Sequence, residues 1–245
     1  MRAIIGRGRI LFVGFIMVAL CWGLLPAPHA AAAAEAAAGG RWCPQQAAPF
    51  CSENAFLDFW RAVNSETGGY ALDIIGYPVS PTLRTAQGTT IQFYERAIFE
   101  WHPQNAVAYQ VQLTRLGATA IDLDTTLGLK DEQNRPPEAC PSNNTCVLAS
   151  PTNHSLRGTF LRYWLGNGGL PVFGYPLTEQ FQLNYNGKPI TVQYFERNRF
   201  EAHPENTDPR YQVLLGRLGA ETLANNIDEV KGWAVVATPN YGEVR

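Results

Sequence analysis

"QFYERAIFEWHPQN", residues 92–105, returns later in the chain as "QYFERNRFEAHPEN", residues 193–206. Extending the comparison to the next "RLG" of each copy, with one extra residue in the second, gives 15 identities in 26 positions. Shorter echoes come before it, "FLDFW" with "FLRYW" and "IIGYPVS" with "VFGYPLT". Self-similarity at a fixed spacing is the signature of a duplicated structural unit. The sequence therefore predicts a tandem repeat of two units.

Each copy begins with a helical pattern. In "SENAFLDFWRAV" we expect Ser52 to be the N-cap, and the apolar residues Phe56, Leu57, Trp60 and Val63 to share one face. The second copy repeats this order in "FLRYWL", and both patterns end at a Gly-Gly pair, which is common where helices stop. A Gly-Tyr-Pro turn follows in each copy.

A strand pattern comes next. In "FQLNYNGKPITVQYFE" an Asn-Gly pair separates two alternating apolar segments, which predicts a hairpin, and a second tight turn near Ala97 or Asn198 returns the chain. The closing segments "YQVQLTRLGA" and "YQVLLGRLGA" fit a strand or a short helix, and we favour the helix. The expected fold class is α+β, with an N-terminal helix, a small antiparallel β-sheet of about three strands and a short closing segment in each unit.

The N-terminal residues 1–32 have the features of a signal peptide. Arg2, Arg7 and Arg9 precede the apolar run "ILFVGFIMVALCWGLL", whose 16 residues fall short of the roughly 20 that a spanning helix needs. A permanent membrane anchor is the disfavoured alternative, and Cys21 follows Leu20, which does not fit a lipidation signal. We expect cleavage, no stable membrane span afterwards, and a secreted or cell-surface protein.

Net charge and cysteine content restrict the kinds of partner and the cellular compartment to expect. Losing the three signal-peptide arginines changes the net charge from −2 to −5, or to −4 if Glu35 is also removed, which argues against a nucleic-acid partner. An even four cysteines are left, and in an exported chain they predict disulfides. The repeat favours the pairs Cys43–Cys51 and Cys140–Cys146. A cysteine-only zinc site is the alternative, but the usual CxxC spacing is missing.

The expected organisation has six parts. They are a signal peptide (1–32), an Ala/Gly linker (33–42), repeat unit 1 (43–120), an exposed linker with the Cys140–Cys146 loop (121–150), repeat unit 2 (151–222) and a C-terminal tail (223–245).

The order of these motifs resembles the LGFP repeats of secreted bacterial cell-envelope proteins. The characteristic turn is "IGYP" at residues 75–78 and "FGYP" at residues 173–176, and Gln193 with Phe195 stands where that family keeps its hairpin Gln and Phe. This chain carries a variant repeat, with the hairpin FERxxFExHPxN. The resemblance implies a non-catalytic module associated with cell-wall or other envelope glycans.

The repeated hairpin carries the main candidates for chemistry. Glu100 with His102, and Glu201 with His203, stand two residues apart, so on a strand each pair would share one face. A carboxylate beside an imidazole can be an acid/base pair or begin a metal site, but each unit repeats only that one histidine, and no HExxH or Gly-x-Ser-x-Gly motif occurs.

A scaffolding role is the favoured interpretation of the hairpin cluster, because repeated scaffolds are commoner than repeated catalytic sets. The residues expected to be structural are Trp60, Trp164, Glu95, Arg96, Glu196, Arg197, Gly76, Pro78, Gly174 and Pro176.

Aromatic residues are candidates for stacking on sugar rings. Phe93 with Tyr94, and Tyr194 with Phe195, alternate along a strand, so one of each pair is expected to face outwards. Trp101 has Ala202 as its partner, which singles it out as a site present in one unit only. The candidate ligand contacts are Trp101, Glu100, His102, Tyr194, Glu201 and His203.

These observations favour an exported repeat module without a catalytic centre, cofactor or metal, which binds envelope polysaccharide or a surface protein. The first alternative is a cell-wall glycan hydrolase that uses the hairpin glutamates, which would need two carboxyl groups about 5 to 10 Å apart across a cleft. The second is a structural spacer for protein–protein contacts.

Overall fold

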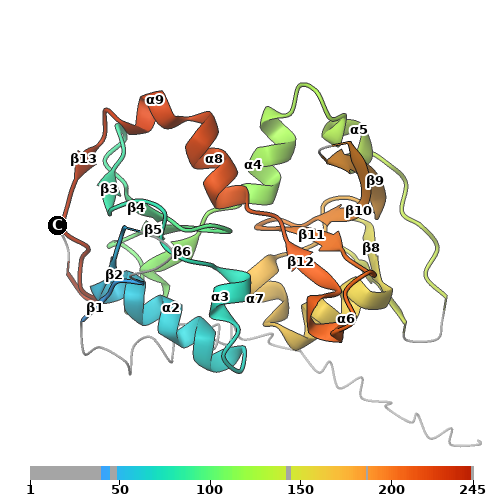
Figure 1. The fold of residues 1–245 in the computed structure, drawn as a ribbon, viewed down its shortest axis with the longest axis horizontal. Helices are drawn as coiled ribbons and strands as arrows, with labels where there is room; N and C mark the ends of the chain where they lie inside the picture. The colour runs from blue at the N-terminus through green and yellow to red at the C-terminus, as the bar shows by residue number, and fades with distance from the viewer. Residues whose placement is uncertain (1–39, 45–48, 142–144, 186, 244–245) are drawn as a thin grey trace, which may run out of the picture.

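The computed structural model describes residues 40–44, 49–141, 145–185 and 187–243 (Figure 1). The expected signal peptide and the expected linker up to residue 39 lie outside these residues. Within the described part, no helix has the length and apolar character needed to cross a bilayer.

The chain forms a mixed α+β structure from small antiparallel sheets and short helices. The first half contains β1 (Arg41–Trp42), β2 (Ser52–Glu53), α2 (Asn54–Glu66), α3 (Ala71–Ile74), β3 (Leu83–Arg84), β4 (Thr90–Phe93), β5 (Ile98–Trp101), η1 (Val107–Tyr109), β6 (Val111–Leu113), α4 (Leu116–Leu123) and α5 (Leu129–Gln133). The second half contains β7 (Cys146–Ala149), β8 (His154–Arg157), α6 (Gly158–Gly166), α7 (Gly169–Phe173), β9 (Phe181–Tyr185), β10 (Lys188–Tyr194), β11 (Arg199–Ala202), η2 (Pro209–Tyr211), β12 (Val213–Leu215), α8 (Leu218–Asn225), α9 (Ile227–Val230) and β13 (Ala234–Val235).

Two larger sheets organise these elements. Their strand orders are β13-β3-β4-β5-β6 and β12-β11-β10-β9, and the repeated hairpins pair in the same register, with Gln92 opposite Phe99 and Gln193 opposite Phe200. The expectation of about three strands and a helical closing segment is wrong in detail. The closing segment forms a fourth strand, β6 or β12, before it turns into a helix, because its first residues complete the sheet edge and its "RLG" leaves that edge.

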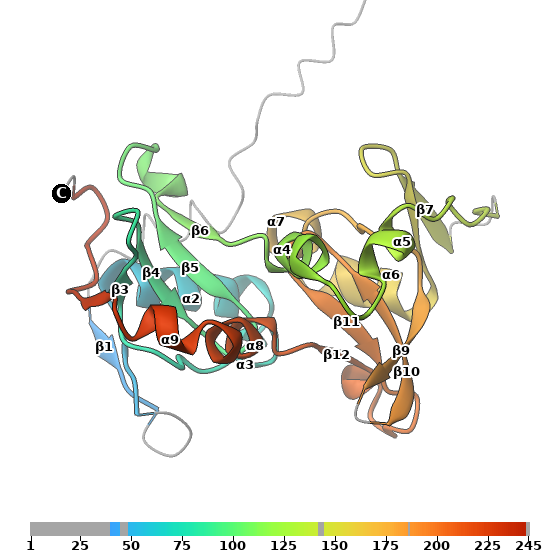
Figure 2. The same cartoon turned by 90° about the horizontal axis from the view of Figure 1, so that it is seen from above.

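The helix that follows each sheet crosses to the other half. Helix α8 packs its Leu218 and Leu223 with Phe93 of the first-half sheet, while α4 places Ile121 beside Tyr194 of the second-half sheet. Figure 1 shows α8 and α9 on the opposite side of the first-half sheet from α2, and Figure 2 shows the same crossing from above. Each sheet is therefore covered by its own N-terminal helix on one face and by a helix from the other half on the opposite face.

The "RLG" motifs make the crossing contacts. The Ala118 amide donates to the Glu196 carbonyl (3.2 Å), and the Ala220 amide donates to the Glu95 carbonyl (3.0 Å). A Cβ on Gly117 would lie 1.8 Å from the Phe195 carbonyl oxygen, so only glycine allows this approach. The two halves are thus joined backbone to backbone.

The crossing buries both faces of each sheet. Phe93, Tyr94, Tyr194 and Phe195 are at most 2% exposed, so the expectation that one of each pair faces outwards is wrong. A sheet with one covered face alternates buried and exposed side chains, whereas a sheet between two helices does not.

The segment expected to be an exposed linker is partly core. Ile121 and Leu129 are each 1% exposed, and they pack against Phe181 and Leu183 of the second-half sheet. The polar residues of the segment lie mainly in the loops around α5, while its few apolar residues cover the second-half sheet.

The C-terminal tail is part of the first-half sheet and covers Trp101. Strand β13 pairs with β3, and Tyr241 meets the Trp101 ring edge to face with centroids 6.0 Å apart. Trp101 is 5% exposed, so its expected role as an accessible ligand contact conflicts with its position. The tail supplies the cover that the sequence did not reveal.

Both disulfides form with the expected pairing, Cys43–Cys51 and Cys140–Cys146. Each closes a short loop ahead of the first helix of its half. Two disulfides indicate folding in an oxidising compartment.

Candidate functional site

The hairpin glutamates hold turns and join the halves. The Glu95 carboxylate accepts hydrogen bonds from the Tyr77 amide (3.2 Å), from Arg96 (3.3 Å) and from Arg217 of the other half (2.9 Å). A Cβ on Gly76 would lie 2.6 Å from Glu95 Oε2, and Gly76 has a φ of +83°, so the turn needs glycine.

Glu196 has the corresponding contacts. It accepts from the Tyr175 amide (3.2 Å) and from Arg115 of the first half (2.8 Å), and Arg197 lies 3.9 Å away. Each carboxylate is therefore held by a backbone amide and by an arginine from the opposite half, which supports a scaffolding role.

The two Glu–His pairs have different surroundings. Glu100 bonds to His102 Nε2 (2.9 Å) and accepts from the Thr114 hydroxyl. Glu201 instead binds Arg199, with Nε to Oε1 at 2.8 Å, and its distance to His203 is 3.7 Å.

Arg199 replaces an isoleucine of the first copy and lies at the centre of a charged cluster. Burial opposes its charge, but Tyr194, Glu221 and Glu201 together raise the pKa of Arg199 above its ordinary value. The Glu201 side of the repeat is therefore built around a buried cation.

Other candidates from the sequence are part of the packing. The indole N–H of Trp60 donates to the Gly76 carbonyl (3.3 Å), and that of Trp164 donates to the Gly174 carbonyl (3.1 Å), so both fix the Gly-Tyr-Pro turns. Tyr194 is 1% exposed beneath α4, so it offers no open ring to a ligand. Pro78 and Pro176 form bridges to the hairpins at residues 94 and 195.

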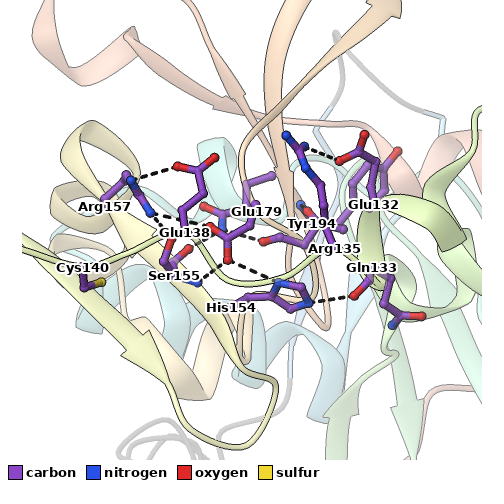
Figure 3. A network of polar contacts seen from close by, with 12 residues as sticks. Glu132, Gln133, Arg135, Glu138, Cys140, His154, Ser155, Arg157, Glu179 and Tyr194 are labelled. Carbon is purple, nitrogen blue, oxygen red and sulfur yellow. Dashed lines mark hydrogen bonds and ion pairs between the residues drawn. The ribbon is translucent and has the colours of Figure 1, made fainter.

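A buried polar network in the second half contains the residue types of a hydrolase (Figure 3). Glu179, 1% exposed, accepts from the Ser155 amide (2.7 Å) and from its hydroxyl, while His154 Nδ1 lies 3.4 Å from Glu179 Oε1. The other ring nitrogen of His154 is 3.0 Å from the Gln133 carbonyl, and Arg157 joins the network to Glu138 (2.9 Å). The histidine lies buried in β8.

The order of contacts in this network differs from a nucleophilic triad. A triad needs the hydroxyl bonded to the imidazole, whereas here the carboxylate stands between Ser155 and His154. All three side chains are at most 4% exposed. The network can fasten β8 to the segment after α5, and its geometry fits that role.

A pocket between the halves combines aromatic and charged side chains. Its volume is about 370 Å³. Its aromatic lining is Tyr70, Tyr163 and Tyr211, and its charged lining is Asp73, Arg96, Arg162 and Arg210. We call this the interface pocket.

Neighbouring contacts hold the arginines of the interface pocket in place. Arg96 reaches across from the first-half hairpin to the Leu215 carbonyl (3.3 Å), and Arg210 pairs with Asp208 (2.6 Å) while its guanidinium lies 5.5 Å from the Tyr211 ring centre. Burial raises the pKa of Tyr163, with Asp73 acting in the same direction and Arg96 against it. The pocket thus offers ordered donors, one acidic acceptor and flat apolar faces.

Sequence reasoning missed this pocket. Of its charged residues only Arg96 belongs to the repeated hairpin, and the tyrosines come from a helix start, a helix and a 3-10 helix that lie far apart in sequence. Tyr211 falls in the closing segment, but its partner Tyr109 does not line the pocket. No local signal connects these positions.

Within the part of the chain that the structure describes, no group of three or more His, Cys, Asp or Glu side chains is placed to hold a metal ion. Comparison with known proteins found no matching family model, no matching curated protein and no matching solved structure. The resemblance to LGFP repeats therefore stays a prediction from the sequence.

Proposed function

We propose that the protein is an exported, non-catalytic module that binds cell-envelope polysaccharide in the interface pocket. In this proposal the two halves are copies of one LGFP-like unit, and their contact creates a site that neither half has alone. The observation that carries the proposal is the convergence of three tyrosines with four charged side chains in one pocket.

The lining suits the chemistry of a sugar. A pyranose ring has apolar C–H faces that can lie on aromatic rings, and a rim of hydroxyls that both donate and accept hydrogen bonds. Arg162 and Arg210 are exposed donors, and Asp73 is an exposed acceptor. Arginine side chains can also bind sugars that bear carboxylate or phosphate groups.

The hydrolase alternative has less support. Each hairpin glutamate is already bonded to an arginine or a histidine, whereas glycosidase chemistry needs two carboxyl groups facing a cleft across the scissile bond. The interface pocket contains one carboxylate, Asp73.

A sedimentation assay on purified bacterial cell wall tests the proposal. We expect the protein to co-sediment, and we expect Tyr211→Ala to weaken binding at least about tenfold, since a buried aromatic contact contributes about 1.4 kcal/mol or more. Tyr109→Ala is the matched control, because it removes the same residue type from the same place in the other half without touching the pocket.

The outcomes separate the alternatives. Equal loss in both variants, or no loss in either, would contradict a site in the interface pocket. No retention of the unmodified protein would favour the spacer or a protein partner, and release of soluble sugar that stops in Glu100→Gln/Glu201→Gln would favour the hydrolase.

A further inference from the structure

The C-terminal tail lies in a groove of the first half. After β13 pairs with β3, the Val236 amide donates to the Thr82 carbonyl (3.0 Å). The Pro239 carbonyl then accepts from the Ala55 amide in the first turn of α2 (3.1 Å). The groove thus holds an extended segment by main-chain bonds to a strand edge and to a helix start.

Side-chain contacts also hold the tail in the groove. The Thr238 hydroxyl bonds to the Thr82 hydroxyl (2.5 Å), the Thr238 carbonyl accepts from the Asn54 side chain (2.9 Å), and Tyr241 packs on Trp101. The segment "AVVATPNY", residues 234–241, is therefore bound through both its backbone and its side chains.

The second half has a groove at the equivalent place, lined in part by Pro141, Thr145 and Cys146 of the Cys140–Cys146 loop. Its volume is about 540 Å³, and its lining includes Gly158, Thr159, Gln180, Thr191 and Ala202. These residues hold the places that Asn54, Ala55, Thr82, Thr90 and Trp101 hold around the tail in the first half. We call this the α6–β9 groove, after the helix that lines it and the strand that begins directly after Gln180.

Local backbone geometry is shared as well. Asn54 and Gly158, which begin α2 and α6, both have positive φ, 49° and 60°. The first amide of each helix donates to a carbonyl of the preceding segment: that of Asn54 to Gly40 (3.0 Å) and that of Gly158 to Thr145 (3.3 Å). The next amide, that of Ala55, binds the tail, so the Thr159 amide is placed to bind a segment in the same way.

The sheet edge beside this groove is open. Strand β3 lies between β13 and β4, whereas β9 pairs with β10 and is the edge of its sheet in the described structure. An exposed edge strand can accept an added strand from another chain. Ala202 in place of Trp101 also leaves room for a large aromatic residue of the incoming segment.

We propose that the α6–β9 groove binds an extended segment of a partner protein by strand addition, with β-branched or small residues followed by a Thr-Pro pair and an aromatic residue. The partner segment is favoured over the tail of a second copy. That tail is already bonded within its own chain and would have to give up those contacts. This site shares Thr159 with the lining of the interface pocket, while Gly158, Gln180, Thr191 and Ala202 line this groove alone, and the proposal does not depend on the polysaccharide.

The test uses the full protein and a synthetic peptide of residues 233–242 as the probe, titrated to about 1 mM because short unfolded segments bind weakly. We expect one peptide per chain, with at least tenfold weaker binding to Thr159→Pro, which removes the amide donor at a helix start where proline is tolerated. Thr159→Ala keeps the amide and should bind within threefold of the unmodified protein.

A second variant gives an independent test that does not depend on how proline affects the helix. Thr191→Arg places a long side chain in the groove from β10, and it should also lower affinity at least tenfold while thermal unfolding stays cooperative. No binding by the unmodified protein would overturn the proposal. So would binding that neither variant changes, which would mean that the probe displaces the tail. Dimers that Thr191→Arg dissociates would overturn the choice of a partner over a second copy.

Discussion

Gly219 is the position where the exchange of helices can be tested most directly. It is the second residue of α8, and a Cβ there would lie 2.1 Å from the Tyr94 carbonyl oxygen and 2.6 Å from that of Ala97. These are backbone atoms of the opposite half's hairpin, so they cannot rotate away. In Gly219→Ala the helix must move back by more than an ångström, and the Ala220 to Glu95 hydrogen bond is lost.

The cost follows from three contributions. Overpacking against fixed backbone costs about 1 to 3 kcal/mol, and one lost buried hydrogen bond adds about 1 kcal/mol. The better helix propensity of alanine returns about 1 kcal/mol. The free energy of unfolding should therefore fall by about 2 kcal/mol, a large share of the 5 to 15 kcal/mol typical of a domain.

Denaturant unfolding followed by tryptophan fluorescence measures this change, and Gly117→Ala should behave like Gly219→Ala because a Cβ there meets the Phe195 carbonyl. The matched control is Gly166→Ala, at the end of α6, where a Cβ would meet no atom within 4 Å. We expect the control to be neutral or slightly stabilising. If Gly219→Ala unfolds within about 0.5 kcal/mol of the control, α8 does not dock on the first-half hairpin as described.

Two further predictions concern the second-half network and the first disulfide. Glu179→Gln should lower the free energy of unfolding by about 3 kcal/mol, because the buried carboxylate accepts several hydrogen bonds that the amide cannot all accept. Glu138→Gln, at the exposed end of the same network, should lower it by less than about 1 kcal/mol. Equal effects of the two changes in thermal unfolding would refute this ranking. The double change Cys43→Ser/Cys51→Ser should cost about 2.5 kcal/mol from the lost loop constraint, and it would be refuted by a denaturation midpoint that does not move.

Local pattern was enough to predict several features. Alternation around Asn-Gly predicted the hairpin that became β9 and β10, and the aromatic spacing from Phe56 to Val63 predicted α2. The even number of cysteines, together with the repeat, predicted the Cys43–Cys51 disulfide that the structure contains. These features depend on residues close in sequence, so a short window contains the information.

The sequence indicated a structural role for the repeated glutamates, but not which half supplies their arginine partners. Glu95 and Arg96 were expected to be structural, and they are bonded to each other, yet the closer partner of Glu95 is Arg217 of the other half. Glu196 behaves in the same way with Arg115. A motif can predict that a carboxylate will be paired, but not from which copy the arginine comes.

The sequence by itself determined the recurring hairpin, the helix before it and the cysteine loops, while the tertiary structure alone decided which half covers which sheet. Helix α8 covers the first-half sheet and α4 covers the second-half sheet, and both contacts join residues of different halves. This arrangement buries Tyr194, places Tyr70 and Tyr163 in the lining of one pocket, and lets the tail cover Trp101. Contacts of this kind join residues distant in the chain, and no periodicity records them.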